Sequence, residues 1–398
     1  MSRDGDRNGL EPTAECEAFR DRVREHIAAH RPDMPRLPGT RSPEAAQLPM
    51  YREWCASLFS AGLIGADWPE RFGGTGAHDP LRDLVVDEEL ADAQVPRPIG
   101  AWNLVCGALF AYGTPEQQGH YLPRIRAFED LWCQLFSEPD AGSDLASLRT
   151  SAVRDGDEWV VNGQKVWTTH AHIADLGFLL ARTDPGVPKH QGVSAFVVDM
   201  RAPGITVRPL REMTGSSDFN EVFFDEVRLP AGSLIGEPGQ GWAIARTALA
   251  HERSQSLRED SATNAVRRLV GLAATPAGDG TPLIQDDQVR RTLGRLYARS
   301  VAADLLGLEG VLKDAAGGTR AYDAPVVKVL FTETNLDIAT YALELLGSRG
   351  VLVEEDPDAV DDGHWQKAFL FARGFTISAG SNEIMRNLIA ERGLGLPK

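Results

Sequence analysis

The spacing of apolar residues changes twice along this chain, from helical to strand-like near residue 150 and back to helical after Gly241. Before the first change, Phe19, Val23 and Ile27 repeat at intervals of four, which is typical of a helix with one buried face. Between the changes, short apolar runs separated by turn residues predict a small antiparallel barrel or sandwich. This order indicates an α+β protein with a helical domain over residues 1–128, a β domain over 129–240 and a helical bundle over 241–398.

Within the middle part, Asn162-Gly163 stands between two apolar runs. Both residues tolerate the positive φ angles of a two-residue turn, so we predict a tight β-hairpin there. Further strands are predicted at residues 178–181, 193–198, 205–207 and 222–224. In the C-terminal part we predict a long helix whose apolar face consists of Val289, Leu293, Leu296, Val301, Leu305 and Leu308.

Composition excludes several classes of function. The formal net charge of −16 argues against a nucleic-acid backbone or an anionic membrane as the main partner, because both repel an acidic protein. The four cysteines form no Cys-x-x-Cys pair and show no metal-ligand spacing, so we expect free thiols in a reducing compartment. No signal peptide or apolar membrane span is evident, and a cytoplasmic location is expected.

Two segments far apart in the chain combine glycine with hydroxyl side chains. They are Ser137-Glu138-Pro139-Asp140-Ala141-Gly142-Ser143-Asp144 and Ser378-Ala379-Gly380-Ser381-Asn382-Glu383-Ile384-Met385-Arg386. Glycine lets a ligand approach the backbone closely, and a hydroxyl can donate to a phosphate oxygen. Either turn alone is more often structural, but together they suggest a cradle for a phosphate-bearing cofactor.

Longer strings around these turns carry a family resemblance. They run from Cys133 to Thr150, from Gly163 to Thr169, from Phe219 to Asp225 and from Gly380 to Arg392. In these strings and in their order, the chain resembles the acyl-CoA dehydrogenase family from about residue 15 to about residue 395. The resemblance implies an N-terminal α-helical domain, a central antiparallel β-barrel and a C-terminal four-helix bundle.

The resemblance also implies FAD as cofactor, in a homo-oligomer, normally a tetramer and otherwise a dimer, where a neighbouring subunit completes each site. The implied cofactor contacts within one subunit are Phe136, Ser137, Gly142, Ser143, Trp167, Thr169, Gly380, Ser381 and Glu383. The contacts that a partner subunit would offer are Glu344, Gly347 and Ser348. For Trp167, a core tryptophan of the barrel is the alternative interpretation.

One feature of the family is missing. Many members carry an Arg-x-Thr-Phe-Gly run whose arginine reaches the cofactor diphosphate across a subunit interface, and here the stretch reads Ala277-Gly278-Asp279-Gly280-Thr281. Arg267 or Arg268 could compensate, although adjacent arginines on a helix are more often solvated.

The catalytic base is the second departure. Desaturation of a thioester needs a carboxylate that removes the α-proton while the β-hydrogen leaves as hydride. The usual glutamate position aligns with Ala379, which cannot act as a base. Some members supply the glutamate from the first bundle helix, just before an arginine, so Glu252 in Glu252-Arg253 is our candidate base. The alternative is an exposed glutamate paired with a neighbouring arginine.

The resemblance further assigns substrate contacts to Arg253 and Ser143, an acyl thioester as substrate and an electron-transfer flavoprotein as acceptor. The thioester carrier, coenzyme A or a carrier protein, stays open. So do two alternative functions: a flavin oxidase or monooxygenase of the same fold, and a partner subunit of a hetero-oligomer that lacks the base or the arginine. His170 and His172 have no nearby third ligand, so we predict no metal site there.

Overall fold

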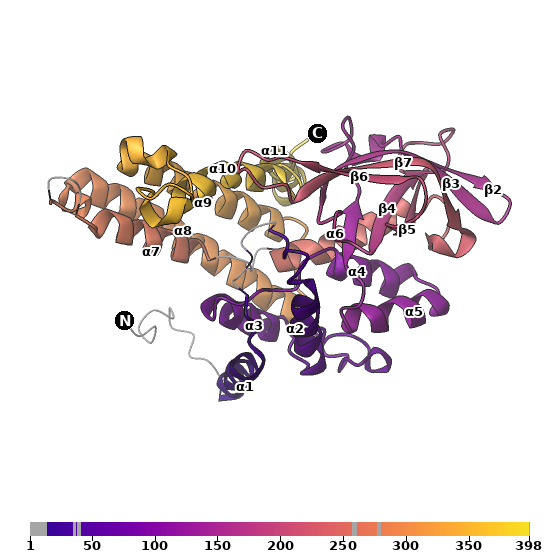
Figure 1. Ribbon diagram of the computed structural model, residues 1–398, viewed down its shortest axis with the longest axis horizontal. Coiled ribbons are helices and arrows are strands. Elements are labelled where there is room, and N and C mark those ends of the chain that lie inside the picture. Colours follow the sequence, from indigo (N-terminus) through magenta and orange to yellow (C-terminus); the bar gives the residue numbers. More distant parts are fainter. Residues whose placement is uncertain (1–13, 35–36, 38–40, 257–260, 277–279, 398) are drawn as a thin grey trace. The chain divides into compact units, whose positions relative to one another are not determined.

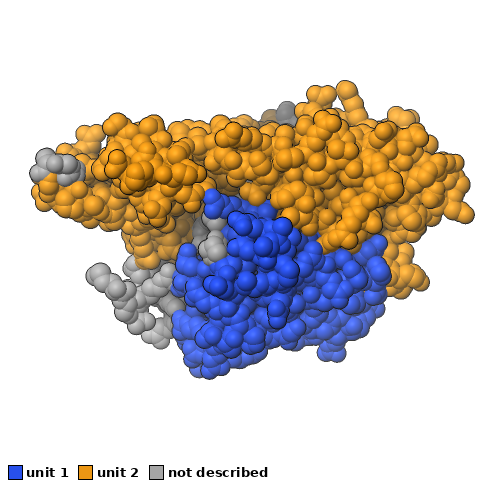
Figure 2. Space-filling view, in the orientation of Figure 1, with its two compact units in different colours: residues 1–99, 119–131 blue, residues 100–118, 132–398 orange. Residues whose placement is uncertain are grey.

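The computed structural model describes residues 14–34, 37, 41–256, 261–276 and 280–397, and of residues 250–256 only the backbone. Helices form the N-terminal part, an eight-stranded sheet the middle and helices the C-terminal part (Figure 1). The three-part order expected from the apolar spacing is therefore confirmed. By its internal contacts the chain divides into two compact units, residues 1–99 with 119–131 and residues 100–118 with 132–398, which Figure 2 colours separately.

The first unit is built around the apolar face predicted for its first helix. α1 (Ala14–His30) buries Phe19, Val23 and Ile27 and packs on α3 (Pro80–Asp92). Beside this interface, Arg20 Nη1 lies 2.6 Å from Oε1 of the buried Glu89. Burial alone would raise the pKa of Glu89, but the guanidinium groups of Arg24 and Arg20 lower it below its usual value. α2 (Leu48–Ser60) contributes the buried side chains Tyr51, Trp54, Cys55, Leu58 and Phe59.

Two helices lie in the part of the sequence where the chain passes from one unit to the other: α5 (Pro115–Arg126) is divided between the units at residue 118, and α4 (Trp102–Tyr112) precedes it. Thr114 caps the N-terminus of α5: Gln117 N donates to Thr114 Oγ1 at 3.2 Å, and Thr114 N donates to Gln117 Oε1 at 3.0 Å. This reciprocal capping box, with proline in the first helical position, satisfies N–H groups that a helix leaves unpaired. α4 belongs to the second unit, where it packs on the helix that follows the sheet.

The sheet is antiparallel except where β1 and β2 run parallel to β4. Its strands are β1 (Trp132–Leu135), β2 (Ser151–Asp155), β3 (Glu158–Thr169), β4 (Leu176–Arg182), β5 (Val193–Asp199), β6 (Ile205–Leu210), β7 (Phe219–Pro230) and β8 (Leu234–Ile235). They pair in the order β6-β7-β3-β2-β4-β5-β8, and β1 joins through β4. The four strands predicted from residue 178 onward are confirmed as β4 to β7. Their inner face buries Leu179, Phe196, Val198, Val222 and Leu229.

The hairpin predicted at Asn162-Gly163 is wrong, because β3 continues through both residues. The chain reverses instead at Gly156-Asp157, where Asp155 pairs with Glu158 and Gly156 has a φ of +62°. Glycine is required at position 163 for another reason. A Cβ there would lie 2.7 Å from the Cα of Thr150, so this glycine permits a close backbone approach at an irregularity in the pairing of β3 with β7.

The C-terminal helices are α6 (Gly241–Ser256), α7 (Ala262–Ala274), α8 (Asp287–Ala315), α9 (Asp323–Leu346), α10 (His364–Ile377) and α11 (Asn382–Leu388). α9 is central, since it contacts α7, α8, α10 and α11. The long helix predicted from residue 289 is confirmed as α8, with Leu293 and Leu296 buried. Its predicted apolar face is wrong at Leu305, which is 42% exposed. Nine residues at about 100° each place Leu305 opposite Leu296 on the helix.

All four cysteines are thiols that form no disulfide, as expected from the sequence, and Cys55, Cys106 and Cys133 are buried. Burial raises the pKa of the Cys55 and Cys133 thiols far above the usual range, which keeps both unreactive. Among the described residues, no helix is both long and apolar enough to cross a membrane.

Candidate active site

The segment after β1 forms a tight turn that presents its glycine and serine outward. Glu138 N donates to Ala141 O, and Ala141 N donates to Glu138 O, both at 3.1 Å. Gly142 and Ser143 follow, and both are exposed. A Cβ on Gly142 would meet nothing within 4 Å. The backbone and the Ser143 hydroxyl are therefore accessible to a ligand.

A buried lysine fixes the base of this turn. Lys165 is 0% exposed, and its Nζ lies 2.8 Å from Glu138 Oε1 and 2.9 Å from Phe136 O. The same carboxylate accepts hydrogen bonds from Arg149 N at 2.6 Å and Thr150 N at 2.8 Å. Through Glu138, both ends of the segment 138–150 are hydrogen-bonded next to Lys165 of β3. The exposed residues between these ends are therefore held in a defined position.

Electrostatics within this pair follow from its burial. Desolvation lowers the pKa of Lys165 to about 8, although Glu138 opposes this shift. For Glu138, burial alone would raise the pKa, but the charge of Lys165 and the hydrogen bonds to its oxygens lower it below the usual range. The ammonium and the carboxylate lie within salt-bridge distance, so each stabilises the charged form of the other.

The strand motif next to this pair contains an outward-facing tryptophan. The pairing of β3 with β7 shifts between Lys165 and Thr168, and Trp167 within this bulge has a φ of +59°. As a result Trp167 is 61% exposed, with its ring edge-on to Phe219 at 5.9 Å between centroids. The alternative of a core tryptophan is therefore wrong for Trp167, and Trp159 on the same strand is the buried one.

Residues expected to meet the flavin ring lie on both sides of this bulge. The Phe136 side chain is buried against Phe178, and Ser137 O accepts a hydrogen bond from Val166 N at 2.9 Å. Thr169, at the end of β3, is partly exposed. The structure therefore brings Phe136, Ser137, Trp167 and Thr169 together at one end of β1 and β3.

His170 and His172 lie in the turn that follows β3. His170 is buried and has a φ of +64°. His172 is exposed, and its Nδ1 lies 3.2 Å from Nδ2 of Asn220. In the described part of the chain, no group of three or more metal-ligating side chains comes together.

The C-terminal turn between α10 and α11 contains two consecutive residues with left-handed backbone. Ala379 has a φ of +53° and Gly380 a φ of +92°. Ser381 caps α11, where its Oγ accepts from Ile384 N at 3.4 Å. Glu383 is exposed in the first turn of α11, and a hydrogen bond to its own backbone N–H, together with one to Ser381, lowers its pKa. Ala379 is exposed and has only a methyl side chain, so this turn supplies no base at that position.

The residues expected to serve a partner subunit lie at the far end of α9. Glu344, Gly347 and Ser348 are all exposed. Lys328 contacts the turn, with its Nζ 2.9 Å from Gly380 O. Glu344 follows sixteen residues later on the same helix, roughly 24 Å along its axis. Within one chain the structure therefore separates these residues from the Gly380 turn.

The candidate base lies on α6, the helix that follows the sheet. The side chains of Glu252 and Arg253 are outside the described residues. The backbone is helical there, and position 252 follows the buried Ala245 and Ala248 by seven and four residues. These intervals place position 252 on the same face of α6 as those alanines.

The stretch that replaces the missing arginine motif is described only from Gly280 onward; residues 277–279 lie outside the described residues. Of the two arginines suggested as substitutes, Arg268 donates to both carboxylate oxygens of Asp361, at 2.6 and 2.7 Å. This bidentate pair uses the guanidinium within its own chain.

Lys165 and Glu138 were not singled out from the sequence as site residues. A signal was present, because Lys165 follows Trp159 and Val161 by six and four residues, so the alternation of a strand assigns it to the same face as these apolar residues. A lysine is rarely buried without a partner. The partner itself, 27 residues earlier, is identified only by the fold.

Three family models match the chain in order. They are described as acyl-CoA dehydrogenase N-terminal domain over residues 13–129, middle domain over 133–227 and C-terminal domain over 239–394. Among curated proteins, acyl-CoA dehydrogenase IpdE1 of Mycobacterium tuberculosis is 41% identical over 87% of this chain and 88% of its own length. Human mitochondrial short-chain specific acyl-CoA dehydrogenase is 30% identical over 83% of this chain and 79% of its own length.

Solved structures give the same result. A structure of the ChsE4-ChsE5 complex from Mycobacterium tuberculosis matches with a TM-score of 0.83 and 32% identity, covering 98% of this chain and 99% of that chain. A structure named Tcur3481-Tcur3483 steroid ACAD matches with a TM-score of 0.84 and 31% identity, covering 98% of this chain and 99% of that chain.

Proposed function

Since this chain belongs to the acyl-CoA dehydrogenase family of FAD-dependent oxidoreductases, we propose that it converts an acyl-CoA thioester into the trans-2-enoyl thioester. The observation that carries the proposal is the ordered match of all three domains, together with a fold in which both glycine-hydroxyl turns are intact.

The residues of the site fit FAD. Trp167 offers an exposed aromatic face beside the fixed backbone of Phe136 and Ser137, which suits a flat ring system. Gly142 and Ser143 leave open space and a hydroxyl for the diphosphate. In the second turn, Gly380, Ser381 and Glu383 would hold the remaining parts of the cofactor. When bound, FAD supplies the acceptor for the hydride that leaves the β-carbon.

Glu252 is the proposed base. Its role is to accept the α-proton of the thioester, which a carboxylate does best when desolvation brings its pKa toward the pH of the medium. Support comes from three facts: Ala379 has no acidic group, Glu252 precedes Arg253 on α6, and position 252 follows the buried Ala248 by four residues along that helix. Arg253 and Ser143 are the proposed substrate contacts.

A single-turnover experiment tests this assignment. In the Glu252→Gln variant, reduction of bound flavin by saturating substrate, followed at its visible absorbance, is expected to slow by at least about a thousandfold. Glu237→Gln is the matched control, because this exposed glutamate lies just before α6. Undiminished reduction in Glu252→Gln would remove Glu252 from the mechanism.

For the acyl group, we propose a bulky polycyclic side chain rather than a straight fatty acyl chain. Support comes from the similarity to the Tcur3481-Tcur3483 protein, which is named a steroid ACAD. Anaerobic titration with steroid side-chain, short-chain and long-chain CoA thioesters, and with one acyl carrier protein thioester, separates these classes. Preferential reduction by a short straight-chain thioester would contradict the proposal. Fast peroxide release during turnover would favour an oxidase instead.

We further propose that the active form is an oligomer in which Glu344, Gly347 and Ser348 contact the cofactor of a second subunit. The length of α9 supports this. Lys328, which contacts the Gly380 turn, and Glu344 lie roughly 24 Å apart along that helix, so the same end of one FAD does not contact both the Gly380 turn and Glu344 of a single chain. The similarity to ChsE4-ChsE5, which is a complex of two differently named chains, favours a related but different second chain. If the protein purified alone is a flavin-loaded monomer, the proposed oligomer is contradicted.

As the acceptor of electrons from the reduced flavin, we propose an electron-transfer flavoprotein.

A further inference from the structure

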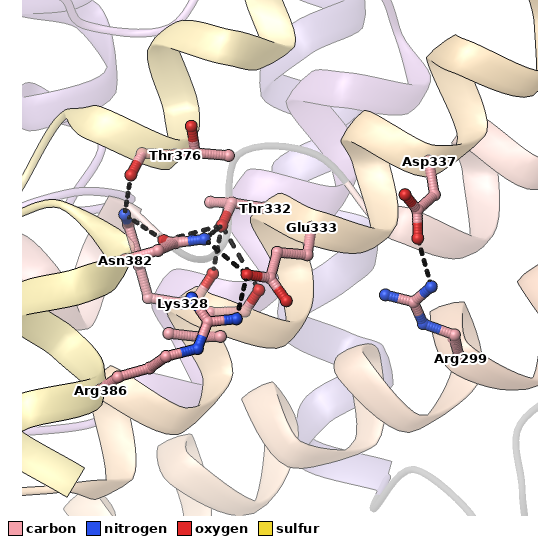
Figure 3. A network of polar contacts seen from close by, with 9 residues as sticks. Arg299, Lys328, Thr332, Glu333, Asp337, Thr376, Asn382 and Arg386 are labelled. Carbon is pink, nitrogen blue, oxygen red and sulfur yellow. Dashed lines mark hydrogen bonds and ion pairs between the residues drawn. The ribbon is translucent and has the colours of Figure 1, made fainter.

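A second buried lysine lies under the C-terminal turn. Lys328, on α9, is 9% exposed, and its Nζ lies 2.9 Å from Gly380 O. The same atom lies 2.7 Å from Asn382 Oδ1 and 3.3 Å from Thr376 O (Figure 3). An ammonium has three N–H groups and no acceptor. Each of its donors therefore has one acceptor here.

These three acceptors belong to three consecutive pieces of chain. Thr376 lies in the last turn of α10, Gly380 in the connecting turn and Asn382 at the start of α11. The last carbonyl groups of a helix lack partners within the helix and attract cations. One side chain thus fixes the end of one helix, the turn and the beginning of the next helix relative to α9.

The turn needs such support because its backbone is strained. Ala379, with a φ of +53°, adopts a conformation that L-residues other than glycine disfavour. Gly380 follows with a φ of +92°, and a Cβ there would lie 2.5 Å from Met385 Cε. A strained, ordered turn of this kind persists only where surrounding contacts determine it.

A second layer of polar contacts orients Asn382 for this task. Asn382 Nδ2 donates to Thr332 Oγ1 at 3.1 Å and to Glu333 Oε1 at 3.2 Å. Glu333 also pairs with Arg386 of α11. In Figure 3 these side chains of α9 and α11 point toward one another. The amide is thereby held with its oxygen toward Lys328.

From these contacts we propose that Lys328 is a positioning residue for FAD, whose ammonium holds the Ser378–Ser381 turn in the conformation that contacts the cofactor. The inference rests on the proposed function, which assigns Gly380 and Ser381 to FAD. It adds a residue that has no place in the motif itself. Lys328 acts through the turn and touches neither the substrate nor the reacting atoms.

The alternative role of Lys328 is that of a general brace for the helical bundle. The two roles differ in what they affect. A brace changes the unfolding temperature of the protein and leaves the cofactor affinity of the folded protein unchanged. A positioning residue changes the affinity for FAD, because the turn must then be ordered at the expense of binding.

The test uses the flavin-loaded protein and two substitutions, Lys328→Met and Lys328→Gln. FAD release on dilution is followed by the rise in fluorescence of the free cofactor, and the folded fraction is checked by circular dichroism. We expect at least about a tenfold weaker affinity for FAD in Lys328→Met, the effect of losing charge-assisted hydrogen bonds. Lys328→Gln, which keeps one donor group, is expected to lie between Lys328→Met and the unsubstituted protein.

Lys313→Met is the matched control. Lys313 lies on α8, is partly buried and pairs with Glu309 at 3.0 Å and Asp323 at 3.2 Å, so it braces the bundle without contacting the turn. It is expected to lower the unfolding temperature and leave FAD affinity unchanged. Equal FAD affinity in Lys328→Met and the unsubstituted protein would overturn the inference, whereas an unsubstituted protein that fails to bind FAD would overturn the proposed function instead.

The pH dependence of FAD affinity in Lys328→Met, relative to the unsubstituted protein, provides an independent readout. Burial lowers the pKa of Lys328 to about 8, although Glu383 and Glu333 oppose the shift. Above this pH the charge is lost. The ratio of FAD dissociation constants between Lys328→Met and the unsubstituted protein is therefore expected to shrink between pH 7 and pH 9.5. Groups that titrate in both proteins, such as Lys165, cancel in this ratio. A ratio above one that stays constant would contradict the role of the ammonium.

Discussion

Lys165 and Glu138 form a salt bridge with 2.8 Å between Nζ and Oε1, in which the lysine side chain is completely buried. Replacement of Lys165 by Met leaves the carboxylate of Glu138 buried without its cation. We expect the free energy of unfolding to fall by about 3–5 kcal/mol, the usual effect of breaking one side of a buried ion pair. Urea denaturation measures this change.

The double variant Lys165→Met/Glu138→Leu is the informative control for this salt bridge. Because it removes both charges, it is expected to recover a large part of the lost stability. In this variant Arg149 N and Thr150 N nevertheless lose their acceptor, so FAD affinity is expected to be lower than in the unsubstituted protein. Full recovery of FAD affinity would contradict the idea that Glu138 frames this segment.

Stability at acidic pH is expected to depend on Glu138. Its pKa in the folded protein lies below the usual value, so it binds a proton less readily folded than unfolded. The stabilisation it provides is therefore present above the ordinary glutamate pKa and is lost as pH falls through the lowered value. In Glu138→Gln the free energy of unfolding is expected to fall less steeply below about pH 4.5. An unchanged slope in urea titrations across that range would contradict this account.

Substitution by alanine is expected to affect different properties at the two tryptophans of β3: stability at Trp159 and FAD affinity at Trp167. Trp159 is 6% exposed and packs edge-on against Phe196, so Trp159→Ala is expected to lower stability by about 3–5 kcal/mol. Trp167 is 61% exposed, so Trp167→Ala is expected to change stability by less than about 0.5 kcal/mol. FAD affinity should fall in the folded Trp167→Ala protein. A large loss of stability in Trp167→Ala with unchanged FAD affinity would indicate a core role.

Glycine at position 379 is expected to stabilise the protein. The φ of +53° is strained for alanine and unstrained for glycine, and this gain exceeds the larger entropy of glycine in the unfolded chain. We expect an increase of roughly 0.5–1 kcal/mol in the free energy of unfolding. Ala372→Gly, at a buried helical position of α10, is the control and is expected to destabilise. A loss of stability in Ala379→Gly would show that the turn relaxes its strain in another way.

The sequence alone determined the order of the parts. Period-four spacing at Phe19, Val23 and Ile27 and the apolar runs of β4 to β7 report which face of each element is buried, and this is local information. The two glycine-hydroxyl turns were also recognisable, because their residue types and order are those of a known family. Local patterns failed where distant contacts decide. Asn162-Gly163 has the composition of a turn, but both residues belong to β3, where Asn162 pairs with Ser151 of β2 and Gly163 with Phe224 of β7.

The partners of the buried charges were decided only by the tertiary structure. Lys328 is the one charged residue in the apolar run from Ala324 to Phe331, which marks it as unusual but does not name its acceptors. Those acceptors lie 48 to 54 residues further along the chain. The exposure of Trp167 likewise follows from a bulge between two strands. Hydrogen bonding and burial depend on which distant segments come into contact. The spacing of residues along the chain reports local periodicity and does not identify these long-range contacts.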